Sequence, residues 1–355
     1  MRCAAILALG LATGMLGCAP LGPRTVPRDR FDYNMAVADS WKEQTLLNIV
    51  KLRYADMPLF VDVASIVSGY TLEGAVSLSG TAASKGADLF NAGASATYTD
   101  RPTVTYAPIT GGQFNRSFMT PIPPRAILFL MQSGWSVELL FPIAVESVSG
   151  LRSRVEAGSS RCDGDPDFYR LIVALRKVQE SGTVGMRILK EGDDKESTVL
   201  FFHTENLDPE VDEALRTLSD LLRIDSTTRE LRVTYGRVPQ SEGEVTMLTR
   251  SLLQMMIHLA AQIDVPPEHI ADGRTVPTME VLEEEHQDVG RLINIHSDTK
   301  RPDDAFSAVR YKDHWFWIDD RDFLSKRTFG FLMILFSLTE TGGKEGLPLV
   351  TIPTG

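Results

Sequence analysis

Apolar and polar residues alternate along two neighbouring segments of the chain. Residues 70–80 read YTLEGAVSLSG and residues 90–99 read FNAGASATYT, with apolar side chains mainly at even positions. A period of two is typical of β-strands that have one apolar face. The small residues between them, GTAASKGAD, predict a connecting loop. We therefore expect a half-buried β-hairpin over residues 70–99, packed closely against whatever covers its glycines and alanines.

A helical period marks several other segments. Apolar residues recur at roughly helical spacing over residues 33–54. Two Asp-Pro pairs, at 165–166 and 208–209, combine an N-cap residue with a proline at the first helical position. Ser241 and Glu244 have the spacing of a capping box, which predicts the start of a further helix. Helices are therefore predicted over residues 33–54, 124–132, 165–180, 208–222, 245–263 and 321–340.

Short apolar runs between and after these helices predict further strands. They lie at residues 184–189, 199–202, 231–235, 306–320 (a hairpin) and 347–353. Helices and strands are interspersed without a regular β-α-β alternation, so the expected fold class is α+β, with mixed helices and antiparallel strands. We expect an N-terminal α+β region over residues 31–160 and a C-terminal α+β region over residues 161–355, as two subdomains.

The first residues have the composition of an export signal. Arg2 is the only charged residue among the first 23, and the apolar segment behind it, CAAILALGLATGML, is too short for a permanent membrane-spanning helix. Leu16-Gly17-Cys18 follows, and these residues resemble the lipobox of bacterial lipoproteins, although Met15 stands where leucine is commoner. Residues 18–30 carry three prolines and no apolar period, and they predict an extended tether.

The lipobox resemblance implies a lipid-anchored protein. In that family a signal peptidase removes the segment before the cysteine, here residues 1–17, and acyl chains are attached to the sulfur and amino group of the cysteine, here Cys18. Several acyl chains hold a protein durably at a bilayer where one chain does not. Ala19 stands where an aspartate would resemble an inner-membrane retention signal, so the implied location is the bacterial outer membrane, facing the periplasm. The alternative is a secreted protein in which Cys18 follows the signal by chance.

The charge balance excludes one class of partner. The chain has 36 basic and 47 acidic side chains, and loss of Arg2 with the signal leaves 35 − 47 = −12. Such a surface repels phosphate backbones, so nucleic-acid partners are not expected. We expect no cofactor either, since the sequence contains no H-E-x-x-H, phosphate-binding loop or G-x-S-x-G motif. The expected partners are the membrane, through the lipid anchor, and other envelope proteins.

The three cysteines have different expected fates. Cys3 leaves with the signal peptide, and Cys18 is the expected lipidation site. Cys162 is then alone in an oxidising compartment, and we interpret it as an inert thiol because no catalytic histidine motif accompanies it. If Cys18 were not acylated, a disulfide between Cys18 and Cys162 would be the alternative.

The best candidate for a chemical site is a polar cluster near the end of the chain. It contains Asp313, His314, Asp319, Asp320 and Asp322. Carboxylates and an imidazole can hold a divalent ion or share a proton. The simpler interpretation is that Asp319 or Asp320 caps the final helix and that His314 lies in a hairpin turn. We favour capping, because it explains these residues without a ligand.

Three longer blocks carry a further resemblance. Residues 40–70 (SWKEQTLLNIVKLRYADMPLFVDVASIVSGY), 108–124 (PITGGQFNRSFMTPIPP) and 311–338 (YKDHWFWIDDRDFLSKRTFGFLMILFSL) together resemble a group of uncharacterised bacterial lipoproteins. This resemblance implies a location in the envelope and no particular activity. It transfers no functional residue beyond Cys18.

These observations favour a non-enzymatic envelope lipoprotein that binds or organises other envelope components. One alternative is a metal-dependent or hydrolytic periplasmic enzyme that uses the carboxylates near Asp319. Another is an oligomer in which each copy contributes residues 70–80 and 89–99 as a hairpin of a membrane barrel, since a tilted transmembrane strand needs about 10 residues. In such a barrel Glu73 needs a water-filled interior. We favour the alternative, in which residues 70–80 and 89–99 are strands of a soluble sheet.

Overall fold

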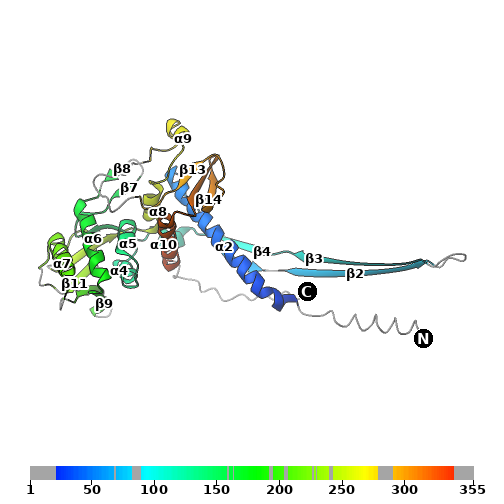
Figure 1. Cartoon of the computed structure of the whole chain (residues 1–355), viewed down its shortest axis with the longest axis horizontal. Helices are drawn as coiled ribbons and strands as arrows, with labels where there is room; N and C mark the ends of the chain where they lie inside the picture. Colours follow the sequence, from blue (N-terminus) through cyan, green and yellow to red (C-terminus); the bar gives the residue numbers. More distant parts are fainter. Residues whose placement is uncertain are drawn as a thin grey trace. The chain divides into compact units, whose positions relative to one another are not determined.

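The protein has the α+β fold that the sequence predicts (Figure 1). The computed structural model describes residues 21–67, 69–81, 89–157, 160–162, 164–191, 195–203, 207–225, 228, 230–239, 243–278 and 291–339. Within these residues the chain forms two compact units, residues 21–41 with 61–108, and residues 42–60 with 109–339. The predicted signal peptide, Cys18 and the predicted strand at 347–353 lie outside the described residues.

The centre of the second unit is a six-stranded mixed sheet in the order β6-β5-β12-β11-β10-β9. Its strands are β5 (Val145–Val148), β6 (Leu151–Arg152), β9 (Val184–Glu191), β10 (Lys195–Phe202), β11 (Glu230–Tyr235) and β12 (Glu244–Thr249). The β11–β12 pair is parallel and the other pairs are antiparallel. The structure differs here from the predicted division at residue 160, because β5 pairs with β12 and so places strands from both predicted regions in one sheet.

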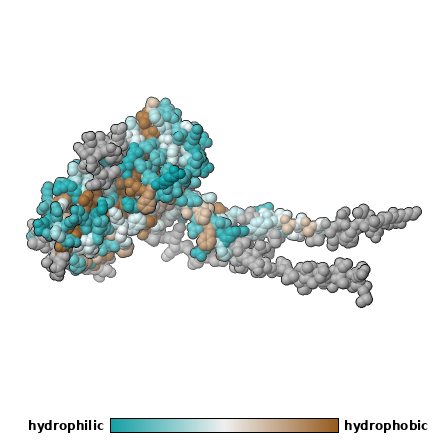
Figure 2. All heavy atoms as spheres, in the orientation of Figure 1, coloured by the Kyte–Doolittle hydropathy of each residue, from teal (hydrophilic) through white to brown (hydrophobic). Residues whose placement is uncertain are grey.

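Helices pack their apolar faces into the core of this second unit. They are α4 (Pro124–Gln132), α5 (Val137–Ala144), α6 (Pro166–Glu180), α7 (Pro209–Leu222), α8 (Leu252–Ala260), α9 (Pro267–Ala271) and α10 (Phe323–Thr339), with the short α3 (Gly111–Phe114) and the π-helical η1 (Asn115–Met119). The largest fully buried side chains include Phe118, Phe141, Phe168, Phe316, Phe329 and Phe331. Polar residues cover much of the visible face of the unit (Figure 2), as expected for an acidic surface over one apolar core.

The two Asp-Pro pairs begin helices, as predicted. Asp165 and Asp208 occupy the N-cap positions of α6 and α7, and the prolines that follow them are the first helical residues. Neither carboxylate caps its own helix by a side-chain hydrogen bond. Asp165 instead accepts the backbone N–H of Arg152 at 2.7 Å, so its side chain joins the start of α6 to β6.

The helix predicted over residues 245–263 is wrong in its first part. Residues 244–249 form strand β12, and the helix α8 starts only at Leu252. The capping box lies at Ser251 and Gln254, where the serine hydroxyl accepts the Gln254 N–H at 3.3 Å and the glutamine side chain accepts the Ser251 N–H at 2.8 Å. The β-branched residues in EVTMLT pair on both sides within the sheet, and this pairing outweighs their helical spacing.

A three-stranded sheet in the order β13-β15-β14 completes the second unit. It consists of β13 (His296–Asp298), β14 (Ala305–Tyr311) and β15 (His314–Asp319), and the last two form the predicted hairpin. Its two-residue turn is Lys312 and Asp313, both with positive φ, at 45° and 67°. His314 is therefore the first residue of β15 rather than part of the turn.

The first unit contains the start of the long helix α2 (Leu21–Arg53) and a two-stranded ribbon. The predicted extended tether is wrong for residues 21–30, which are the first turns of α2. Pro27 lies inside α2 and lacks the N–H that a helical hydrogen bond to the residue four positions earlier needs. The predicted helix over residues 33–54 is confirmed as the remainder of α2.

The ribbon runs from residue 61 to residue 108. Its strands are β1 (Val61–Val67), β2 (Tyr70–Thr81), β3 (Leu89–Asp100) and β4 (Thr103–Pro108). β1 pairs with β4 and β2 pairs with β3, both antiparallel, and the Arg101 N–H donates to the Gly69 carbonyl between the two pairs at 2.9 Å. The hairpin predicted over residues 70–99 is thus confirmed.

The second unit also contains a separate small pair of strands, β7 (Val155–Ala157) and β8 (Ser160–Cys162). Cys162 lies at the end of β8.

Candidate functional site

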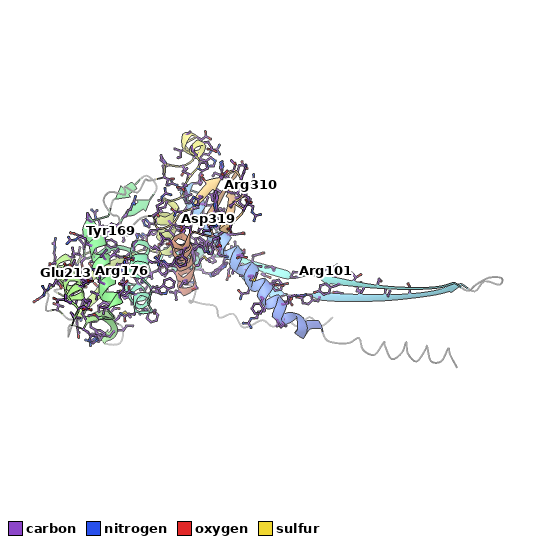
Figure 3. All side chains as sticks on the ribbon, viewed as in Figure 1. Arg101, Tyr169, Arg176, Glu213, Arg310 and Asp319 are labelled. Atoms are coloured by element: carbon purple, nitrogen blue, oxygen red, sulfur yellow. The ribbon has the colours of Figure 1, made fainter. Side chains whose placement is uncertain are left out.

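The structure does not bring together the predicted site residues near the end of the chain. His314 and Asp319 begin and end the same strand, β15, so they lie about 17 Å apart along it. Figure 3 labels Arg310, which is next to the turn, and Asp319, at the far end of the hairpin. The imidazole of His314 is thus separated from the carboxylates of Asp319 and Asp320.

The carboxylates themselves are engaged in local structure. Asp319 Oδ1 accepts the backbone N–H of Arg321 at 2.8 Å, and Asp320 Oδ1 pairs with Lys326 Nζ at 2.7 Å. Asp322 caps the final helix, because its Oδ1 accepts the N–H of Ser325 at 3.0 Å. The prediction that Asp319 or Asp320 caps this helix is therefore wrong, since α10 begins directly after Asp322.

Asp322 is also held by side chains. Its Oδ2 accepts from Ser325 Oγ at 2.6 Å and from Asn294 Nδ2 at 2.8 Å. Burial raises the pKa of Asp322, but the hydrogen bonds from Ser325 and Asn294 outweigh burial and leave the pKa below its usual value. This carboxylate is therefore charged at neutral pH and committed to joining α10 to the segment before β13.

His314 belongs to a different polar cluster, which we call the Tyr54 cluster (Tyr54, Glu268, His269 and His314). Tyr54 follows α2, Glu268 and His269 lie in α9, and His314 begins β15. The Tyr54 hydroxyl and His269 Nδ1 are 2.7 Å apart, and His314 Nε2 lies 3.0 Å from Glu268 Oε1. The rings of His269 and His314 meet edge to face with centroids 4.8 Å apart. Three segments that are distant in sequence are thereby joined.

Burial shifts the pKa values of two groups in this cluster, His269 and Tyr54. Burial lowers the pKa of His269, and the nearby His314 lowers it further. Burial also raises the pKa of Tyr54 to about 12. At neutral pH the hydroxyl and the His269 imidazole are therefore both uncharged and share one hydrogen bond. This hydrogen bond joins the residue that follows α2 to α9.

The sequence analysis missed Tyr54 and His269. Tyr54 carries the helical period of α2, and His269 is an isolated histidine in a polar segment 215 residues away. No local spacing connects two residues that meet only through tertiary folding. Tyr54 lies within residues 40–70, one of the three blocks that resemble uncharacterised bacterial lipoproteins, but that resemblance transfers no functional residue in the block.

Among the described residues, no group of three or more His, Cys, Asp or Glu side chains is placed to hold a metal ion. No helix in the described part of the chain is both long and apolar enough to cross a membrane.

The β2–β3 hairpin is the most distinctive surface of the first unit. Its register places Leu72 opposite Tyr98 and Val76 opposite Ala94. Because side chains alternate along a strand, the even-numbered positions of both strands share one face. That face carries Tyr70, Leu72, Gly74, Val76, Leu78, Gly80, Phe90, Ala92, Ala94, Ala96, Tyr98 and Asp100. It is therefore apolar over almost its whole length.

The other face of the hairpin is mainly small and polar. Thr71 lies opposite Thr99, Glu73 opposite Thr97, and Ser79 opposite Asn91. Thr71, Glu73, Ser77, Ser95 and Thr97 are exposed. The hairpin thus has two chemically different faces, as the alternation in the sequence predicts.

The expectation that these strands are half-buried is wrong. On the apolar face, Ala94 and Ala96 are exposed, and Tyr98 is 48% exposed. β2 and β3 form a sheet of two strands, and no other described strand pairs with the outer edge of either. The small residues therefore do not reflect close packing within the described residues of the first unit.

The start of α2 contacts the hairpin at one end. The Tyr70 hydroxyl donates to Asp29 Oδ2 at 2.5 Å, and Asp29 Oδ1 pairs with Arg28 at 3.1 Å. The rings of Tyr70 and Tyr98 stack with centroids 6.1 Å apart. These contacts fix one end of the hairpin to the helix, and the apolar face begins directly at this point.

Comparisons of this chain with protein-family models, with curated proteins and with solved structures find no match. Among the residues that the structure describes, the β2–β3 hairpin is a candidate binding element, and the Tyr54 cluster is a polar cluster whose groups bond to each other.

Proposed function

We propose that this protein is a non-enzymatic lipoprotein of the bacterial outer membrane, anchored through Cys18 and facing the periplasm, that binds or organises other envelope components. The anchor is supported by the resemblance of Leu16-Gly17-Cys18 to a lipobox behind a short apolar segment. The binding role is supported by the β2–β3 hairpin.

The observation that carries the binding role is the exposure of Ala94, Ala96 and Tyr98 on the apolar face of the hairpin, within the part of the chain that the structure describes. Exposed apolar surface that is continuous and bordered by polar residues marks sites of protein or membrane interaction. No other strand in the described ranges pairs with the outer edges of β2 and β3, and such edges offer main-chain donors and acceptors to a further strand. These edges and the exposed apolar side chains together form a surface suited to a partner.

The use of the polar side chains supports a non-enzymatic role. Asp320 is paired with Lys326, Asp322 caps α10, and His314 is paired with Glu268. Each of these groups has a structural partner, and the strand β15 separates His314 from the carboxylates. A hydrolytic or metal site needs such groups to converge on one point.

Mass measurement of the mature amino terminus tests the anchor. We expect the N-terminal peptide to begin at Cys18 and to carry acyl chains, and we expect Cys18→Ala to lose both the cleavage before position 18 and the acyl mass. Cys162→Ser is the matched control, since it removes a thiol and leaves the lipobox unchanged. An unmodified thiol at Cys18 contradicts the proposal.

Crosslinking in the native envelope tests the binding role. A photoreactive residue at Ala96, on the apolar face of the hairpin, is expected to capture an envelope component. The same residue at Arg216, on the exposed side of α7, is the control position and is expected to capture nothing specific. Equal capture at both positions contradicts a binding role for the hairpin.

A further inference from the structure

We propose that the hairpins of several copies of this chain pair edge to edge and cross a lipid bilayer, with the apolar face toward the acyl chains and the polar face toward water. This inference rests on the proposed function, because the lipid anchor brings the copies to one membrane. It adds the identity of the partner, which is the lipid bilayer together with further copies of the same chain.

The length of the hairpin matches a bilayer. β2 and β3 have 12 residues each, and 12 residues at about 3.4 Å per residue extend for about 40 Å. At the tilt of about 45° that transmembrane strands adopt, this length covers about 28 Å along the membrane normal. The hydrocarbon core is about 30 Å thick. A ribbon that only displayed a short protein-binding motif would not need this length.

The two faces match the two environments of a membrane-spanning strand. Strands that cross a membrane around a water-filled interior alternate apolar side chains toward lipid with polar side chains toward water. The register of β2 and β3 places only apolar residues and glycine at the even-numbered described positions from 72 to 98, while the other face is polar apart from Ala75, Leu89 and Gly93. Glu73 lies on the polar face, opposite Thr97, and is exposed. A carboxylate at that position remains hydrated.

Tyrosine residues mark one end of the apolar face. Tyr70 and Tyr98 stack there, and Tyr70 also bonds to Asp29 of α2. Tyrosine rings prefer the interface between headgroups and acyl chains. The contact with Asp29 therefore marks the level at which the hairpin leaves the bilayer.

The open edges require more than one copy. Every backbone N–H and C=O in the hydrocarbon core needs an internal partner, because an unsatisfied group costs several kcal/mol there. A single hairpin satisfies only the groups between β2 and β3, and within the described residues no other strand covers their outer edges. The β2 edge of one copy and the β3 edge of the next satisfy each other, and a closed ring leaves no edge exposed to lipid.

Charge substitutions on adjacent residues test the inference. Ala94 and Ser95 are neighbours in β3, both exposed, and lie on opposite faces. The full acylated chain is reconstituted into phosphatidylethanolamine–phosphatidylglycerol vesicles that contain a small self-quenching dye. We expect the natural chain and Ser95→Arg to release dye and to give crosslinked species larger than a dimer. Ala94→Arg is expected to reduce both signals at least tenfold, since it places a charge in the acyl chains.

Lipid quenching provides a readout that does not depend on dye release. In a Cys162→Ser background, a fluorophore is attached at Ala96→Cys or at Thr97→Cys, and the vesicles contain phospholipid with brominated acyl chains. We expect quenching at position 96 and little at position 97. Equal quenching at both positions overturns the inference, and so does a monomer whose Ala94→Arg and Ser95→Arg variants behave alike.

The failure of this inference can be distinguished from failure of the proposed function. The mass of the N-terminal peptide is read from the same preparation. Acylated Cys18 with no difference between Ala94→Arg and Ser95→Arg overturns the membrane-spanning hairpin and leaves the anchored binding protein intact. An unmodified Cys18 with alternating quenching at positions 96 and 97 supports the hairpin and overturns the anchor.

Discussion

At the scale of single residues, the buried histidines make the stability of the protein depend on pH. His258 in α8 is buried, and burial together with the charges of Arg250 and Arg154 holds its pKa well below the usual value. The pKa of His269 is also lowered, mainly by burial. In both cases the unfolded chain binds a proton more readily than the folded chain does.

We therefore expect the free energy of unfolding to fall as the pH drops below about 6.5, the unfolded pKa of histidine. Each such histidine contributes a slope of up to about 1.4 kcal/mol per pH unit until its own folded pKa is reached. Urea unfolding at pH 7 and pH 5 measures this slope. His258→Leu is expected to have a smaller slope, and the exposed His203→Leu serves as the control. If the free energy of unfolding of His258→Leu depends on pH as steeply as that of the natural chain, the lowered pKa of His258 is contradicted.

The capping role of Asp322 is also testable at this scale. Asp322→Ala removes the acceptor for the Ser325 N–H and two side-chain bonds, and we expect it to lower the free energy of unfolding by about 1–2 kcal/mol. Asp320→Ala removes a partly exposed pair with Lys326 and is expected to cost less than about 1 kcal/mol. Urea unfolding of both variants at pH 7 checks the order. A larger loss in Asp320→Ala would contradict it.

At the scale of elements, local patterns were sufficient where one residue type decides the structure. The strict alternation over residues 70–99 identified the hairpin, and the Asp-Pro pairs identified the starts of α6 and α7. A proline fixes the first helical φ whatever the rest of the chain does. These features were predictable because their cause lies within a few residues.

Sequence patterns did not predict the structure where contacts between residues distant in sequence determine it. Residues 245–249 have apolar spacing compatible with a helix, yet they pair with β5 and β11, which the local sequence does not reveal. The alternation in the hairpin could not show whether anything covers its apolar face. In the Tyr54 cluster, two residues 215 positions apart meet across one hydrogen bond, and no spacing rule connects them.

The pairing of β9 and β10 depends on a glycine opposite an aromatic ring. Gly185 is paired with Phe201, and a Cβ atom at position 185 would overlap that ring. We expect Gly185→Ala to lower the free energy of unfolding by about 1–3 kcal/mol, because the ring must move away. In a Phe201→Ala background the same substitution is expected to be neutral or stabilising. A double-mutant cycle in urea measures the difference, and equal effects in both backgrounds would refute the overlap.

At the scale of the whole molecule, the ribbon is an insertion into the chain of the second unit. Phe60 precedes it and Ile109 follows it, and the Ile109 N–H donates to the Phe60 carbonyl at 2.9 Å. Both residues are buried, and the Phe60 ring stacks on Phe118 with centroids 4.0 Å apart. The second unit therefore holds the two ends of the ribbon together by its own contacts.

Excision of the ribbon tests this independence. Replacing residues 61–108 by a short Gly-Ser linker is expected to leave one cooperative unfolding transition, with a melting temperature within a few degrees of the intact protein, since the core of the second unit is retained. Circular dichroism during heating measures this. Phe60→Ala in the same background is the control, and it is expected to lower the melting temperature because it removes a buried ring. Loss of the transition on excision alone would show that the ribbon supports the core.

Because Phe60 and Ile109 hold the two ends of the ribbon together, the length of the ribbon can change while the fold of the second unit stays the same. Adding two residues to each strand lengthens an antiparallel ribbon by about 7 Å and returns every later side chain to its original face. Neither end of the ribbon moves when this happens. A change in ribbon length therefore alters how far the hairpin extends and requires no compensating change in the second unit.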